Sequence, residues 1–233
     1  MSRTMDADNF RRMVVGLCLI AAPLVLLVAL VVHPGGGNAG LAQTVTEYPG
    51  RVQAASLLIV LSSVLFAPAL IGLLPLFGGR GTVLGHIGVG LALIGVIGHA
   101  VWAGFQIVLA GVAQSGIGQA QFSAMVESGP PNAGFIVVLL MFMVGFFPGL
   151  LILAIGLWRG RVAPVWAVAC IIALVVWDFV PVEGGAIVAA IGSVLGLIGF
   201  GAIGLKLLTT QVRETGHVSA SEGAGVTAQP RVQ

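Results

Sequence analysis

The hydrophobic positions fall into six long blocks separated by short polar stretches, at residues 12–33, 52–77, 83–109, 133–158, 162–181 and 185–208. Each block supplies about the 20 apolar residues that a helix needs to cross a hydrocarbon core of ~30 Å. None shows the alternation of polar and apolar residues that is typical of barrel strands. The pattern therefore predicts an all-α, polytopic membrane bundle with six transmembrane helices.

Small residues follow one face of the third block, which we expect near the centre of the bundle. At intervals of three and four residues this face carries Gly85, Gly88, Ala92, Gly95, His99, Trp102 and Gln106. Small side chains let helix backbones approach closely inside a membrane, so this face is predicted to point into the bundle. The sixth block carries a comparable glycine stripe, suited to close packing or to contact with a second copy or a partner subunit: Gly185, Ala189, Gly192, Gly196 and Gly199.

Composition supports the membrane assignment. Of the 233 residues, 58% are hydrophobic and 8% are charged, whereas soluble domains carry about 25% charged residues. We expect a cytoplasmic leader at residues 1–11, a six-helix transmembrane domain at residues 12–208 and a disordered cytoplasmic tail at residues 209–233, which is rich in small and polar residues.

The charged residues orient the chain. If the N-terminus is cytoplasmic, all ten Lys and Arg residues except Arg51 fall on the cytoplasmic side, which is a strong positive-inside bias. Both termini are then cytoplasmic. The basic residues are scattered rather than clustered, so the sequence does not indicate nucleic-acid binding.

The second outer connection, residues 110–132, is the longest of the outer connections. Its Phe122, Met125 and Val126 predict a short amphipathic helix on the membrane surface. A lid over an outward-facing cavity is the alternative interpretation.

Two ionisable residues are expected at similar depth in the outer third of the membrane. His99 and Asp178 each lie 16 residues into a block, the third and the fifth, and a helix rises 1.5 Å per residue. Ionisable groups inside a membrane are costly and are therefore functional candidates. Further residues that could line the same outward-opening cavity, as ligand-binding candidates, are Arg51, Gln53, Trp102, Gln106, Trp177 and Glu183.

A carboxylate beside an imidazole would form a proton-responsive pair. Each residue also has a purely structural interpretation. His99 could donate to a backbone carbonyl of a neighbouring helix, and Asp178 could sit at the water interface or pair with Arg51.

Several chemistries find no support in the sequence. The four histidines (His33, His86, His99 and His217) are too dispersed for a zinc site, and two stacked haems would need two more membrane histidines. No G-x-x-x-x-G-K-[ST] or G-x-S-x-G motif occurs. We therefore predict no metal and no cofactor, and no catalytic residue is assigned. Cys18 and Cys170 lie inside apolar blocks, which predicts free thiols.

The chain resembles a bacterial family of six-helix membrane proteins known only as a domain of unknown function. The resembling features are Arg51 at the start of the second block, the run from Gly156 to Arg161 (GLWRGR) and the following Pro164-Val165-Trp166. The resemblance covers roughly residues 10–208 and implies a bacterial cytoplasmic membrane protein with six helices. It implies no activity.

The sequence leads to three functional hypotheses. The first is an integral membrane protein that binds or moves a small, largely apolar molecule through an outward-facing cavity, with membrane lipids around it. The second is an accessory or structural subunit of a membrane complex, and the third is a membrane-embedded enzyme acting on a lipid or isoprenoid substrate, with Asp178 or Glu183 as general acid.

Overall fold

A computed structural model describes residues 2–34, 40–127, 133–178 and 190–209 of the chain, and every regular element in these ranges is helical. The elements in chain order are α1 (Ser2–Val32), α2 (Leu41–Glu47), α3 (Pro49–Leu73), η1 (Leu74–Leu76), η2 (Gly79–Gly81), α4 (Thr82–Gln114), α5 (Gln119–Glu127), α6 (Ala133–Leu140), η3 (Met141–Phe146), α7 (Phe147–Arg159), α8 (Val165–Asp178) and a last helix, Ala190–Thr209.

Five helical segments are long and apolar enough to cross a membrane: Asp8–Val32, Pro49–Leu76, Gly79–Gln114, Ala133–Arg159 and Ala190–Thr209. The all-helical fold with several helices capable of spanning a membrane is thus confirmed, whereas six such spans are not. The segment predicted at residues 162–181 appears as α8, which has 14 described residues. Fourteen residues rise about 21 Å, less than the ~30 Å of a hydrocarbon core. The residues that follow Asp178 lie outside the described ranges.

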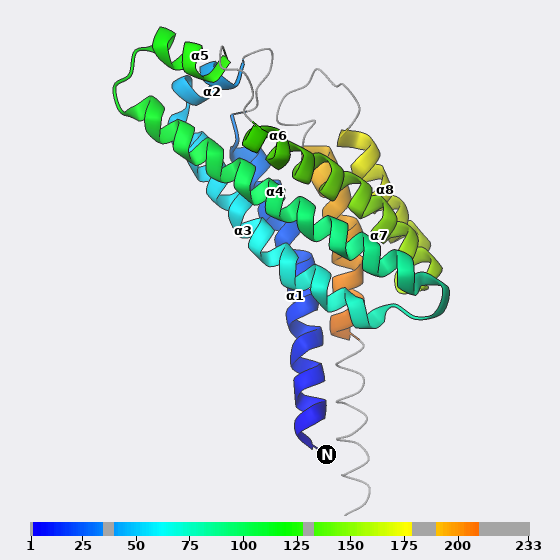
Figure 1. Ribbon diagram of the computed structural model, residues 1–233. Helices are drawn as coiled ribbons and strands as arrows, with labels where there is room; N and C mark the ends of the chain where they lie inside the picture. Colours follow the sequence, from blue (N-terminus) through cyan, green and yellow to red (C-terminus); the bar gives the residue numbers. More distant parts are fainter. Residues whose placement is uncertain (1, 35–39, 128–132, 179–189, 210–233) are drawn as a thin grey trace, which may run out of the picture.

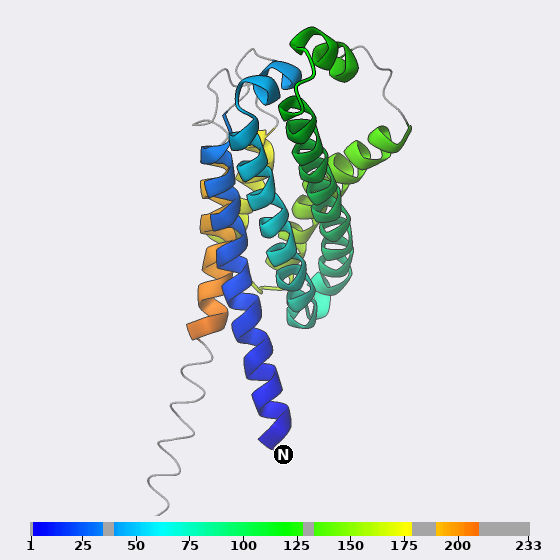
Figure 2. The ribbon, with the colours of Figure 1, turned by 90° about the vertical axis from the view of Figure 1, so that its left-hand side faces the viewer.

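The long helices form a ring (Figures 1 and 2). α1 packs against α3, α3 against α4, α4 against α7, and α7 against α8. The helix Ala190–Thr209 closes the ring, because its Gly204 lies against Gly16 of α1 and its Gly199 lies against Ile171 of α8. α4 is therefore one wall of the ring and not its centre, contrary to the sequence-based expectation, and its Ile87 and Val101 are exposed on the outside.

α4 and α7 approach each other through small residues, as the face of the third block predicted. A Cβ atom added at Gly88 would overlap the backbone of Leu153, and one added at Gly149 would overlap the backbone of Ala92. Backbone atoms thus occupy the space that side chains would otherwise fill, which is how helices pack tightly in a membrane.

The register between these two helices changes at η3, a π-helical segment. Gly85 faces Gly156. Ala92, seven residues further along α4, faces Gly149, which is seven residues back along α7. The next pair, Gly95 and Gly145, lies three residues further along α4 but four residues back along its partner. The wider turn of a π-helix takes up the additional residue.

The described part of the glycine stripe in the last helix packs within the chain. Gly192 lies against Trp177, Gly196 against Leu174 and Gly199 against Ile171, all on α8. These three glycines therefore serve an intramolecular contact, and they do not form an open surface. Gly185 and Ala189, which belong to the same predicted stripe, lie outside the described residues.

The end of the bundle away from the N-terminus carries α2 and α5 (Figure 1). α5 is the short helix expected in residues 110–132, but its Phe122 is 1% exposed and packs with Val45 of α2 and Leu109 of α4. Phe122 is thus a protein core residue and not a membrane-surface contact. The sequence did not predict α2.

The first helix begins earlier than expected. α1 starts at Ser2, so the predicted leader at residues 1–11 is helical from Ser2 onward. No proline or glycine precedes Pro23 in the sequence except Gly16, and an Asp8–Arg11 ion pair at 3.4 Å has the spacing that supports a helix. The predicted tail lies outside the described residues from residue 210 onward.

Candidate functional site

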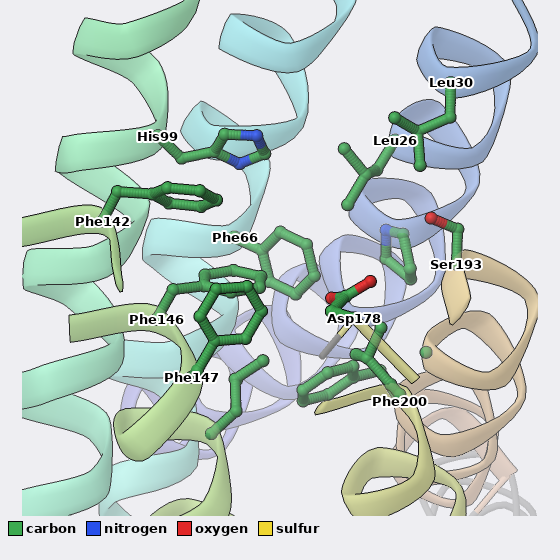
Figure 3. Close-up of a pocket in the computed structure, with 14 residues that line it drawn as sticks. Leu26, Leu30, Phe66, His99, Phe142, Phe146, Phe147, Asp178, Ser193 and Phe200 are labelled. Carbon is green, nitrogen blue, oxygen red and sulfur yellow. The ribbon is translucent and has the colours of Figure 1, made fainter. Parts of the chain in front are cut away.

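A cavity of about 280 Å³ lies inside the ring, in the half of the bundle away from the N-terminus. All six walls contribute to it: α1, α3, α4, the η3–α7 segment, α8 and the last helix (Figure 3). Its lining is formed by Pro23, Leu26, Leu30, Phe66, His99, Phe142, Phe146, Phe147, Leu150, Leu174, Asp178, Ser193, Gly196 and Phe200. The cavity is therefore mainly apolar and aromatic, with three polar side chains.

His99 enters the cavity from α4. Its ring stacks on Phe142 with the centroids 4.8 Å apart and an interplanar angle of 21°, and Phe146 lies 5.8 Å away. Both phenylalanines belong to η3, so the π-helical turn brings two aromatic rings to one imidazole. The predicted alternative, a hydrogen bond from His99 to a backbone carbonyl, does not occur within the described residues.

Asp178 enters from the last described turn of α8 and points into the same cavity (Figure 3). Its Oδ1 lies close to Gly192, where an added Cβ would be only 3.2 Å away. Ser193, 5% exposed, lines the cavity from the last helix. An acid, a hydroxyl and an imidazole thus share one largely apolar space.

His99 and Asp178 therefore share a cavity, as their equal depth predicted, but they do not form a pair. Among the described residues no ion pair or hydrogen bond joins them. The Asp8–Arg11 ion pair lies on the surface, away from the cavity. Figure 3 shows the imidazole and the carboxylate at separate places on the cavity wall, with Phe66 between their levels.

Two other candidates make structural contacts instead. Gln106 is buried and its Oε1 accepts a hydrogen bond from Ser56 Oγ at 3.0 Å, which ties α4 to α3. Arg51 donates from Nε to the carbonyl oxygen of Val32 at 3.1 Å, and its guanidinium lies 5.8 Å from the ring centroid of Tyr48. Arg51 thus caps the end of α1 and does not pair with Asp178.

Of the remaining candidates, the three that lie in the described ranges do not line the cavity either. Trp102 packs with Phe105 and Phe135, whose rings form an aromatic wedge between α4 and α6. Figure 2 shows α6 leaning away from α4 at this level. Gln53 is half-buried on α3, Trp177 is half-buried on α8, and Glu183 lies outside the described residues.

Sequence reasoning missed the aromatic wall of the cavity. Phe66, Phe142, Phe146, Phe147 and Phe200 surround it. Two pairs of these rings pack edge to face, Phe66 with Phe200 and Phe146 with Phe147, both with centroids 5.5 Å apart. The only sequence signal was the spacing of Phe142, Phe146 and Phe147, which an ordinary apolar helix also shows. Ser193 gave no signal, because serine is common at helix contacts in membranes.

No group of three or more His, Cys, Asp or Glu side chains that could hold a metal ion occurs in the described ranges. Comparisons with known protein families, with curated proteins and with solved structures each found no match. The resemblance to the bacterial six-helix family therefore stays a prediction.

Proposed function

We propose that this chain is an integral membrane protein that binds or moves a small, largely apolar molecule carrying a hydrogen-bond donor or an amine. The observation that carries the proposal is the cavity inside the ring, with aromatic and aliphatic walls and the three polar side chains of His99, Asp178 and Ser193. Ligand sites typically combine apolar walls with a few placed polar groups.

The size of the cavity favours a small ligand. Its volume of about 280 Å³ lies just below the ~300–1,000 Å³ that is usual for small-molecule sites. A bulky isoprenoid chain would not fit without movement of the walls, so the enzymatic alternative on such a substrate receives less support than binding.

The polar groups favour a donor on the ligand. Asp178 has no cationic partner among the described residues, and a carboxylate at membrane depth is costly unless it is paired. An amine or hydroxyl on the ligand would supply that partner. The rings of Phe142 and Phe146, tilted at 36° to each other, offer π faces on which a cationic group is also favourable.

We further propose that the cavity half of the bundle faces outward and that both termini are cytoplasmic, in a bacterial cytoplasmic membrane. The support is the positive-inside bias. η2, the end of α7 and the end of the last helix lie at the end of the bundle near the N-terminus (Figure 1), and these elements carry Arg80, Arg159 and Lys206. Reporter fusions to each terminus test this orientation, and an active periplasmic reporter at either terminus would contradict it.

The binding proposal is tested with hexylamine, hexanol and hexane on the full chain in mild detergent, with native mass spectrometry as the readout. We expect retention in the order amine, alcohol, alkane. Asp178→Asn should abolish the preference for the amine, whereas Glu47→Gln, which neutralises an exposed acid of α2 outside the cavity, should keep it.

Failure to retain any of the three probes would overturn the proposal. A stoichiometric protein partner that copurifies with the ligand-free chain would instead support the alternative of an accessory or structural subunit.

A further inference from the structure

A second cavity, of about 660 Å³, opens at the other end of the bundle. It lies between residues 10–15 of α1, the end of α3 with η1, and the start of α4. We call it the α1–α3 groove. It shares no lining residue with the cavity of His99 and Asp178, so it is independent of the function proposed above.

The shape of the α1–α3 groove follows from the sequence of α3. Pro68 and Pro75 lie seven residues apart and both line it, and beyond Leu73 the helix tightens into the 3-10 turn η1. At Gly72 the two helices touch, because an added Cβ would overlap Val15 of α1. The proline rings and the glycine leave the surface beside this contact hollow.

The walls of the groove are apolar and open to the outside of the bundle. Phe10 is 64% exposed and Ile71 is 53% exposed. In a chain that spans a membrane, such a groove meets the acyl chains of lipids. The lipid surroundings are as apolar as the groove, so the apolar walls alone do not select one lipid over another.

Two polar side chains at the groove provide selectivity. Within the described residues, the partner of the Arg11 guanidinium is Asp8 at 3.4 Å, and both side chains are more than half exposed. Exposed ion pairs of this kind contribute little to stability. A phosphate can therefore take the place of the Asp8 carboxylate or bind Arg11 beside it. Arg11 can therefore hold an anionic headgroup.

His86 presents one ring nitrogen to a ligand. Its Nδ1 lies 2.8 Å from the carbonyl oxygen of Thr82, so that nitrogen carries the hydrogen and donates it. In this tautomer Nε2 is the acceptor nitrogen of the ring, which suits a hydroxyl group on the ligand.

Basic residues around the α1–α3 groove also favour an anionic ligand. The described basic residues at this end are Arg11, Arg12, Arg80, Arg159, Arg161 and Lys206, against Asp8 as the acid next to the groove. Basic residues at a membrane surface attract anionic lipids.

We propose that the α1–α3 groove binds one anionic phospholipid with a hydroxyl-bearing headgroup, of the phosphatidylglycerol class, from the leaflet at the N-terminal end. The phosphate contacts Arg11, a headgroup hydroxyl donates to Nε2 of His86, and an acyl chain lies along Pro68 and Ile71.

The test is native mass spectrometry of the full chain with equimolar phosphatidylglycerol, phosphatidic acid and phosphatidylcholine. We expect one tightly retained phosphatidylglycerol. Arg11→Gln should weaken its binding about tenfold, the effect of losing one charge-assisted contact. Arg80→Gln, which removes the same charge at the same end but does not line the groove, should leave it unchanged.

His86→Phe keeps an aromatic ring but removes the acceptor, so it should reduce phosphatidylglycerol retention to the level of phosphatidic acid, which lacks the headgroup hydroxyls. The thermal midpoint of each variant in detergent should match that of the parent, which separates lost binding from lost folding.

Three outcomes would overturn the proposal. Equal retention of phosphatidylglycerol and phosphatidylcholine would show an unselective lipid annulus. Equal losses in Arg11→Gln and Arg80→Gln would show a diffuse effect of charge. A dimer that Arg11→Gln dissociates, with no lipid retained, would show that a second copy covers the groove.

Discussion

His99 and Asp178 line one cavity from α4 and α8, two helices separated in the ring by α7, and in the described part of the chain no bond joins them. The imidazole instead stacks on Phe142 at 4.8 Å, and the carboxylate faces the cavity on its own (Figure 3). The site is therefore better suited to a ligand that bridges the two groups than to a preformed ion pair.

A larger side chain on α1 can fill the cavity while its three polar side chains stay unchanged. Leu26→Trp should occupy the space and reduce retention of hexylamine to the detergent background, because Leu26 lines the cavity. Native mass spectrometry measures this. Leu24→Trp, at a position on the same helix that is 45% exposed and does not line the cavity, should bind as the parent does. Unchanged binding in Leu26→Trp would mean that the ligand sits elsewhere.

The contact between α4 and α7 should be intolerant of a single methyl group. We expect Gly88→Ala to destabilise the bundle by about 1–3 kcal/mol, because the added Cβ overlaps the backbone of Leu153 and the helices must move apart. Thermal or denaturant unfolding in detergent measures the loss. Gly90→Ala on the same helix, where an added Cβ meets no atom within 4 Å, is the matched control and should not destabilise. Equal effects of the two variants would place the contact elsewhere.

Ser56 and Gln106 should be energetically coupled. Their hydrogen bond at 3.0 Å is buried between α3 and α4, and interhelical hydrogen bonds in membranes are worth about 0.6–2 kcal/mol. A double-mutant cycle of Ser56→Ala and Gln106→Leu should therefore give a coupling energy of about 1 kcal/mol. Ser62→Ala, which removes a bond to the carbonyl oxygen of Ala22, should be additive with Gln106→Leu. Additivity in the first cycle as well would contradict the assignment of Gln106 as a structural residue.

Stability should depend on the protonation of His33, which follows the last residue of α1. Burial, and after it the charge of Arg51, lower the pKa of His33 below its ordinary 6.5. The unfolded chain then binds the proton more readily than the folded chain does. The contribution of neutral His33 to the free energy of unfolding should be complete above pH 6.5. It should fall as the pH drops below that value and level off below the lowered pKa of His33.

Thermal unfolding in detergent between pH 7.5 and pH 4.5 measures this dependence on His33. His33→Gln should flatten the profile in that window. Arg51→Gln should reduce the slope, because one of the two causes of the shift is removed. A profile that is as steep in His33→Gln as in the parent would assign the titration to another group.

Much of this protein can be derived from its sequence, because the membrane leaves few choices. Apolar blocks long enough to cross a bilayer must be helical, since every backbone polar group needs a partner within its own segment. The spacing of Gly85, Gly88, Ala92 and Gly95 likewise fixed which face of α4 would meet another helix, since only small residues permit that approach. The positions of His99 and Asp178 along their blocks predicted that both could reach one cavity, and both line it.

Only the tertiary structure decided which helices meet and what surrounds the polar residues. Periodicity gives a residue its height and face, but not its neighbours, so Gln106 and Arg51 could not be separated from His99 until their partners Ser56 and Val32 were known. The π-helical turn η3, which carries Phe142 and Phe146 to the imidazole, depends on the one-residue offset between α7 and α4. That offset becomes visible only when α4 and the η3–α7 segment, which are far apart in the chain, are packed against each other.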